Sequence, residues 1–181
     1  MRSILLPLVS TLALLGACSS THRDARAPAP SATMQASWKV DRPEDPAPGT
    51  PAGEVVRELR NYYHDFSARD WEAFADHFWP NATLATLWTP PGAESLELQA
   101  STVPEFVAKA PEGPGSATIF EEWMTSAEIH VDGDLAQVWA LYGARFGEPD
   151  DLVEWSGTDA FTLLQHEGRW RIVSLAWASD R

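Results

Sequence analysis

Residues 62–78 read YYHDFSARDWEAFADHF and carry the pattern of two consecutive helices. Apolar residues in the first half continue a stripe that starts at Val55 and Leu59 and recurs every three or four positions, as on one buried face of a helix. Asp70 precedes a second apolar group and predicts an N-cap, because its carboxylate can accept a hydrogen bond from a first-turn backbone N–H. The second helix therefore has one apolar side, made of Trp71, Phe74 and Phe78.

The rest of the chain after these helices is mostly extended. Residues 82–88 predict a strand, 96–98 a short edge strand, and 102–107 a third helix opened by the capping box Thr102-Val103-Pro104-Glu105. Turn signals at Asp132-Gly133 and His166-Glu167-Gly168 then separate longer extended stretches, which cover residues 118–131, 135–146, 155–165 and 170–177. Helices first and antiparallel strands second predict an α+β fold, with the helices packed on one face of a curved sheet.

The N-terminus has the pattern of an export signal. Arg2 precedes an apolar run over residues 4–15, which is too short to span a bilayer but fits the core of a secretory signal peptide. The run ends in Leu15-Gly16-Ala17-Cys18, which resembles the lipobox of bacterial lipoproteins and implies a lipidated Cys18; the alternative is a plain signal peptide with a chance cysteine. Ser19 after the cysteine favours the outer membrane in the resembled system, so we expect a protein anchored on the periplasmic side of the cell envelope.

These features divide the chain into a signal peptide (1–17), a tether (18–53) and a folded domain (54–181). The tether is rich in Ala and Pro without a sustained hydrophobic period, which predicts disorder. The whole chain of 181 residues has 13 Lys and Arg against 26 Asp and Glu, a net charge of −13. Such a charge argues against nucleic acid as a partner, and a single cysteine excludes a disulfide framework and a cysteine-based zinc site.

The domain resembles the nuclear transport factor two-like superfamily, which includes SnoaL-like polyketide cyclases and ketosteroid isomerases. The resemblance rests on residues 62–78, NATL at 81–84, GTDAF at 157–161 and GRWRIVSL at 168–175. It implies a cone-shaped, curved antiparallel sheet wrapped around the N-terminal helices, with a pocket at the open end. This fold hosts enzymes, ligand binders and adaptor modules alike.

The resemblance to ketosteroid isomerases also implies candidate site residues. Tyr62 matches their tyrosine and Asp159 their protonated aspartic acid, while Thr86 occupies the position of the catalytic carboxylate base. A threonine hydroxyl has no usable basicity near neutral pH. Tyr62 and Asp159, the two positions that match, each have a structural alternative to a catalytic role. Tyr62 is then a core residue. Asp159 is then a carboxyl group that is exposed, paired with Arg145, bonded to backbone donors, or protonated.

The histidines suggest a second kind of catalysis, because the scytalone dehydratases of this superfamily use His and Asp to move protons. His130 is the candidate, as a dyad with Asp159 if the strands bring them together. His166 in its turn and His77 on the second helix are expected to be exposed. No histidine pair has zinc-ligand spacing, and we expect no metal or other cofactor.

Nine tryptophans are many for a chain of this length, and some of them could line the cone instead of filling its core. An aromatic pocket suits a flat apolar or weakly cationic ligand. The residues expected to contact the ligand are Tyr62, Thr86, Trp88, Trp139, Asp159 and Phe161.

Three functions remain open at this point. The first is non-catalytic binding of a small hydrophobic molecule or a partner protein by an envelope lipoprotein. The second is a SnoaL-like isomerase, cyclase or dehydratase that moves protons with Tyr62, Asp159 and a histidine. The third is an adaptor that forms a homodimer through the open face of the sheet.

The lipid anchor can be tested directly. Cys18→Ser removes the sulfur that accepts the lipid, and several acyl chains together are needed for stable anchoring. We expect the wild type in the membrane fraction and the variant in the soluble fraction after cell lysis and centrifugation. Identical partitioning of the two proteins would contradict the lipoprotein assignment.

Overall fold

The computed structural model describes residues 36–40, 46–89 and 94–180. The predicted signal peptide and Cys18 lie outside these residues. Two described parts of the predicted 18–53 tether have regular structure: residues 36–40 form strand β1 (Ala36–Val40), and helix α1 (Pro51–Ala68) begins three residues before the expected domain start. Strand β1 pairs antiparallel with β4 (Ile119–Asp132), so its backbone satisfies an otherwise open sheet edge.

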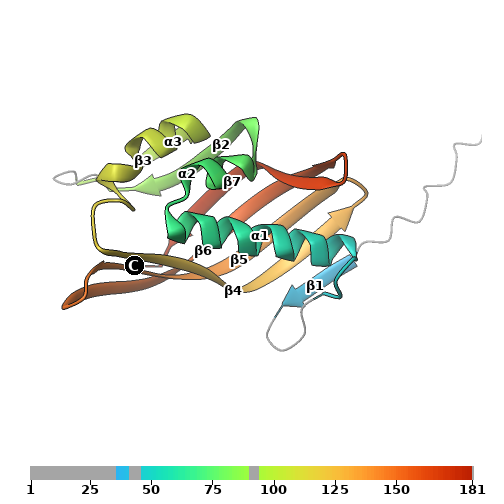
Figure 1. Ribbon diagram of the computed structural model, residues 1–181, viewed down its shortest axis with the longest axis horizontal. Coiled ribbons are helices and arrows are strands. Elements are labelled where there is room, and N and C mark those ends of the chain that lie inside the picture. The colour runs from blue at the N-terminus through green and yellow to red at the C-terminus, as the bar shows by residue number, and fades with distance from the viewer. Residues whose placement is uncertain (1–35, 41–45, 90–93, 181) are drawn as a thin grey trace, which may run out of the picture. The chain divides into compact units, whose positions relative to one another are not determined.

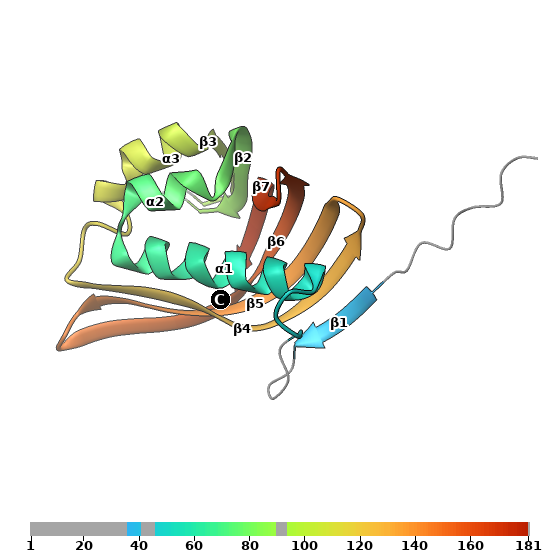
Figure 2. The same ribbon diagram turned by 45° about the vertical axis from the view of Figure 1, so that its right-hand side comes forward.

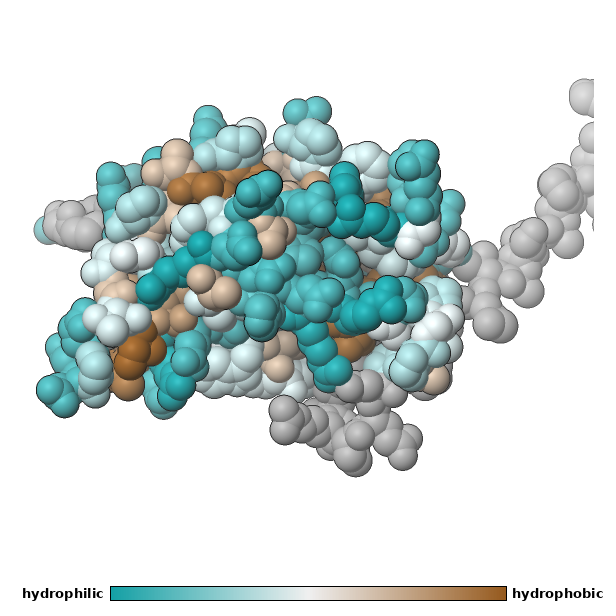
Figure 3. Space-filling model, in the orientation of Figure 1, coloured by the Kyte–Doolittle hydropathy of each residue, from teal (hydrophilic) through white to brown (hydrophobic). Residues whose placement is uncertain are grey.

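The fold is α+β, as predicted: α1 lies across the concave side of a curved, unclosed sheet (Figures 1 and 2). Helices α2 (Trp71–Asp76) and α3 (Val103–Lys109) lie at the end of the sheet that contains β2 and β3. The 3-10 helix η1 (Ala110–Glu112) follows α3. The side of the molecule that carries α1 is mostly hydrophilic, with small apolar patches (Figure 3).

The sheet has seven strands in the order β1-β4-β5-β6-β7-β2-β3. Its remaining strands are β2 (Phe78–Trp88), β3 (Glu97–Thr102), β5 (Leu135–Glu148), β6 (Asp151–His166) and β7 (Arg169–Ser179). All pairs are antiparallel except β2 and β7, which run parallel. The prediction of an entirely antiparallel sheet is therefore wrong at this one pair. Strand β2, which follows α2 directly, enters the sheet in the same direction as the last strand, β7.

Local signals account for where the helices begin. The Thr50 hydroxyl caps α1 by accepting a hydrogen bond from the Gly53 N–H at 3.1 Å, and Asp70 caps α2 through the Ala73 N–H at 3.1 Å. The predicted capping box opens α3, where the side chains of Thr102 and Glu105 each accept a bond from the other's backbone N–H. Helix α2 ends at Asp76, so Phe78 begins β2 instead of continuing the helix.

The core lies between α1 and the concave face of the sheet. The predicted stripe of α1 is buried there, and the ring of Tyr62 contacts that of Phe161 edge to face with 5.4 Å between centroids. Aromatic pairs of this kind add to the free energy of burial. Phe74 and Phe106 extend the same cluster under α2 and α3, with their rings stacked at 5.7 Å.

The outer face of the sheet carries apolar side chains that the fold leaves uncovered. On β5, Ala136, Val138 and Ala140 are buried, whereas the alternate residues Trp139 and Leu141 are 60% and 46% exposed. On the β6 side of Trp139 the residues are small, since Ala160 of β6 pairs with it and Ala176 of β7 comes next across the sheet.

Trp170 on β7 gives a test of the core. Its side chain is 3% exposed, so Trp170→Ala should lower the free energy of unfolding by about 3–5 kcal/mol. The indole N–H has no acceptor among the described residues, so Trp170→Phe gives up no hydrogen bond and should cost less than the alanine variant. Urea unfolding measures both; a loss under about 1 kcal/mol for Trp170→Ala would place the indole outside the core.

Candidate functional site

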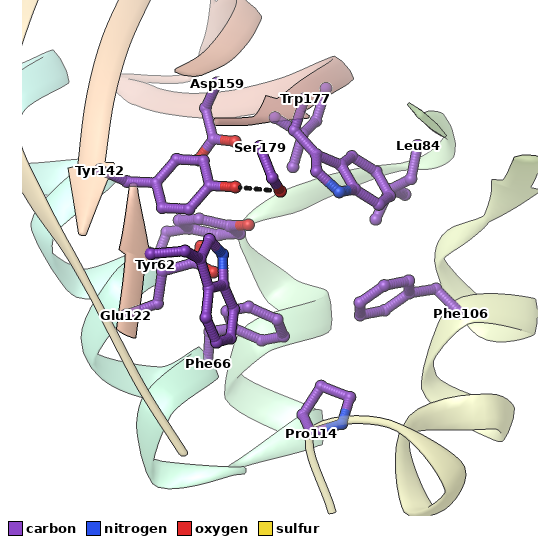
Figure 4. A pocket seen from close by; sticks show the side chains of 12 residues that line it. Tyr62, Phe66, Leu84, Phe106, Pro114, Glu122, Tyr142, Asp159, Trp177 and Ser179 are labelled. Carbon is purple, nitrogen blue, oxygen red and sulfur yellow. Dashed lines mark hydrogen bonds between the residues drawn. The ribbon is translucent and has the colours of Figure 1, made fainter. Parts of the chain in front are cut away.

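A cavity of about 210 Å³ opens between helices α1 and α3 and strands β2 and β4–β7 (Figure 4). Its walls are mainly aromatic, and its polar side-chain groups are two carboxyls, three hydroxyls and two indole N–H groups. The residues that line it are Tyr62, Phe66, Leu84, Phe106, Pro114, Glu122, Tyr142, Trp155, Asp159, Leu175, Trp177 and Ser179.

Asp159 is a deeply buried carboxyl of this cavity. Its residue is 3% exposed, and the Tyr63 hydroxyl donates a hydrogen bond to Oδ2 at 2.5 Å. The other oxygen, Oδ1, accepts no hydrogen bond from the described residues. Burial raises the pKa of Asp159 from 3.8 to about 7, and the bond from Tyr63 offsets only part of that rise.

Glu122 of β4 supplies the second carboxyl. Burial, followed by the nearby Asp159, raises the pKa of Glu122 well above its ordinary value. Two hydrogen bonds tie its backbone to α1: Ser67 Oγ donates to the Glu122 carbonyl at 3.0 Å and accepts from its N–H at 2.9 Å. No described residue bonds to the Glu122 side chain, so this carboxyl is held in place through its backbone.

Tyr142 depends on a glycine of the neighbouring strand. An added Cβ at Gly157 would lie 2.4 Å from the Tyr142 hydroxyl oxygen, so only glycine leaves room for this ring. The hydroxyl forms a 2.9 Å hydrogen bond with Ser179 Oγ, which Figure 4 marks. Gly157 of the GTDAF motif thus shapes the wall beside Asp159.

The structure brings Tyr62 and Asp159 to the same cavity, as the resemblance implies. However, the residue that bonds Asp159 is Tyr63, the next residue of α1, and Tyr62 packs among the core rings. Burial, then the charge of Asp159, raises the pKa of both phenols well above 10.0. Both hydroxyls therefore stay protonated at neutral pH. Arg145 is not the partner of Asp159, because it pairs with Glu121 at 2.6 Å.

The remaining predicted ligand contacts lie elsewhere. Thr86 donates a hydrogen bond to the Trp177 carbonyl at 2.7 Å and lines a separate hollow with Trp88. Phe161 is buried in the core behind Tyr62, and Trp139 lies exposed on the outer face. The tryptophans that do line the cavity are Trp155 and Trp177.

The histidines do not join this site. His130 is exposed beside Glu128, with 3.1 Å between Nε2 and Oε1, on the face of the sheet opposite to Asp159, so the two form no dyad. The expectation for His166 is confirmed by its 66% exposed side chain, but the expectation for His77 is wrong.

His77 lies buried between two carboxylates. Its Nδ1 contacts Glu58 at 2.8 Å and its Nε2 contacts Asp65 at 2.9 Å. The pKa of His77 is raised: burial acts against the charged form, but the hydrogen bonds to the two carboxylates outweigh it. This ion cluster joins α1 to the start of β2, and it explains why a polar residue at the end of α2 is not solvated.

The described residues contain no group of three or more His, Cys, Asp or Glu side chains that could hold a metal ion. No helix within the described ranges is long and apolar enough to cross a membrane.

The sequence profile of the SnoaL-like domain matches residues 52–176, and the chain therefore belongs to the SnoaL-like family. No curated protein matches the chain.

Solved structures support the same fold. A variant of a Mycobacterium tuberculosis protein of unknown function is 17% identical over 71% of this chain and 70% of that one, with a TM-score of 0.58. The CaMKII hub of S. rosetta is 17% identical, with 74% and 100% covered and a TM-score of 0.58. The β subunit of benzoate 1,2-dioxygenase from Burkholderia mallei is 14% identical, with 72% and 91% covered and a TM-score of 0.57. At these identities the likeness shows the fold alone.

Asp159→Asn tests the raised pKa. Folded Asp159 keeps a proton that the unfolded chain releases, so its contribution to stability is lost as pH rises from about 4 to 7. A shift of this size corresponds to about 4 kcal/mol. The substituted amide does not titrate, and the variant should be more stable than the wild type by about 2–4 kcal/mol at pH 8 but not at pH 4.

Urea unfolding between pH 4 and 8 measures this difference. Glu121→Gln, on the outward side of β4, is the matched control and should follow the wild type at every pH. Wild-type and Asp159→Asn curves that run parallel over the whole range would show that the Asp159 carboxyl ionises normally.

Proposed function

We propose that this chain is a lipoprotein of the bacterial cell envelope whose SnoaL-like domain binds a small, flat, largely apolar molecule in the cavity between α1 and the sheet. The observation that carries this proposal is the cavity itself: aromatic walls with a few polar groups gathered near Asp159. Concave apolar sites with a small number of placed polar groups are the usual form of small-molecule sites. The anchor at Cys18 and the periplasmic, outer-membrane location rest on the lipobox resemblance.

The size of the cavity limits the ligand. A volume of about 210 Å³ equals that of roughly seven water molecules. One or two fused rings fit within these walls, and a larger skeleton would extend beyond them. Pro114, after η1, and Phe106, on α3, form the side of the cavity opposite to Asp159 (Figure 4).

A second function, proton transfer, is favoured by one specific observation. Asp159 has a pKa of about 7 and faces the cavity, which suits a group that takes and returns a proton near neutral pH. In this reading Asp159, with Glu122 beside it, replaces the base that is missing at Thr86. The reaction class is that of the SnoaL-like isomerases, cyclases and dehydratases.

Partner binding through the outer face stays a prediction. The exposed Trp139 and Leu141 support a homodimer formed through this surface. Similarity to the CaMKII hub supports self-association without indicating a surface.

Binding of 2-naphthol, followed by its own fluorescence, tests the ligand-binding function. We expect saturable binding by the wild type and a loss of about tenfold in Trp177→Ala, which removes one aromatic wall. Trp139→Ala, at an exposed indole outside the cavity, is the matched control and should bind like the wild type. Equal binding by both variants, or no binding by the wild type, would contradict the proposal.

The same proteins separate binding from catalysis. We expect no wild-type turnover of 3-cyclohexenone, a β,γ-unsaturated ketone that fits the cavity. Turnover that is lost in Asp159→Asn and kept in Glu121→Gln would replace the binding function with proton transfer.

A further inference from the structure

The cavity holds two acidic groups for which its own walls supply no cationic partner. Asp159 and Glu122 are its only ionisable carboxyls, and none of its lining residues is Lys, Arg or His. A buried carboxylate without a cationic partner is costly, and removing one partner of a buried pair leaves the other charge uncompensated. A ligand could therefore supply the positive charge that the cavity walls lack.

Three cationic or protonatable side chains that could have balanced the carboxyls are engaged elsewhere. Arg145 of β5 points outward to Glu121, and Arg69 donates to the Ala117 carbonyl at 2.8 Å. His77 lies between Glu58 and Asp65. Accordingly, none of these three side chains forms an ion pair with the carboxyls of the cavity.

One oxygen of Asp159 is available to a ligand. Oδ2 is bound by Tyr63, whereas Oδ1 has no partner among the described residues, although the residue is only 3% exposed. Figure 4 shows Asp159 and Glu122 on the side of the cavity opposite to Phe106 and Pro114, with the Tyr142 and Tyr62 rings beside them. Since both carboxyls line the cavity, a donor that enters it would meet both of them.

The walls favour a cation over an anion. Trp155, Trp177, Tyr142 and Phe66 surround the space with aromatic rings, whose faces carry partial negative charge and attract ammonium groups within about 6 Å. The formal net charge of −13 also raises the local concentration of cations around the molecule. Both effects act against a carboxylate or phenolate ligand.

We infer that the cavity binds a protonated amine carried on a single ring or a similarly compact apolar body. The ammonium group bonds to Asp159 Oδ1 and Glu122, and the apolar part lies against Phe106, Trp155 and Trp177. This inference rests on the proposed ligand-binding function and names the chemical class of its ligand.

Three probes of one shape test the charge: 2-phenylethylammonium, 2-phenylethanol and phenylacetate. Isothermal titration at pH 8 should show the ammonium binding at least about tenfold more tightly than the alcohol, with phenylacetate weakest. Asp159→Asn and Glu122→Gln should each weaken the ammonium by about tenfold and change the alcohol by less than about twofold. Glu121→Gln is the matched control and should bind all three probes like the wild type.

The pH dependence gives a second readout. The titratable groups that face Asp159 are Tyr62 and Tyr63 of α1, Glu122 of β4 and Tyr142 of β5. The phenols stay protonated, so the carboxyls control the response. With an Asp159 pKa of about 7, ammonium affinity should rise about tenfold or more between pH 6 and pH 8, and alcohol affinity should not.

The possible outcomes separate this inference from the function on which it rests. An alcohol that binds as tightly as the ammonium overturns the cation class and leaves the ligand-binding function standing. Phenylacetate as the tightest probe also overturns it and indicates protonated carboxyls acting as donors. No binding by any of the three probes, together with no binding of 2-naphthol, overturns both proposals.

Discussion

The carboxyl group of Asp159 lies inside a largely apolar cavity. Among the described residues, Tyr63 is its one hydrogen-bond donor, and no cationic side chain lines the cavity. Ionising this carboxyl costs free energy because it is buried without a cationic partner. Helix α1 positions the acidic groups of the cavity: its apolar stripe packs on the sheet, its Tyr63 bonds Asp159, and its Ser67 holds the backbone of Glu122. The electrostatics of the cavity therefore depend on how α1 is seated.

Most of the fold could be predicted because its signals are local. Stripes three to four residues apart, the caps at Asp70 and Thr102, and the turns at 132–133 and 166–168 each follow from chemistry within a few residues of sequence. The parallel pairing of β2 with β7 could not be predicted in this way, since strand order depends on where distant segments meet. The short strand β1 was missed because the composition around it is typical of a linker.

The site was predicted less well, because it depends on which face of a strand each residue occupies. On β5 the small residues Ala136, Val138 and Ala140 are inside and the large Trp139 is outside, the reverse of what side-chain size suggests. On β4 a bulge between Met124 and Ser126 shifts the alternation by one residue, and this turns Glu122 toward the cavity. Asp159 was identified only because the resemblance singled out its GTDAF motif.

Asp159 is a buried carboxyl, and the ligand preference proposed for the cavity requires that it ionise near neutral pH. The most direct test is the pH titration of its side-chain carboxyl ¹³C chemical shift, assigned by the signal that disappears in Asp159→Asn. We expect a midpoint near 7 for Asp159 in the ligand-free protein. A midpoint at the ordinary value of about 4 would show that water or an unrecognised cation reaches this carboxyl, and would contradict the account.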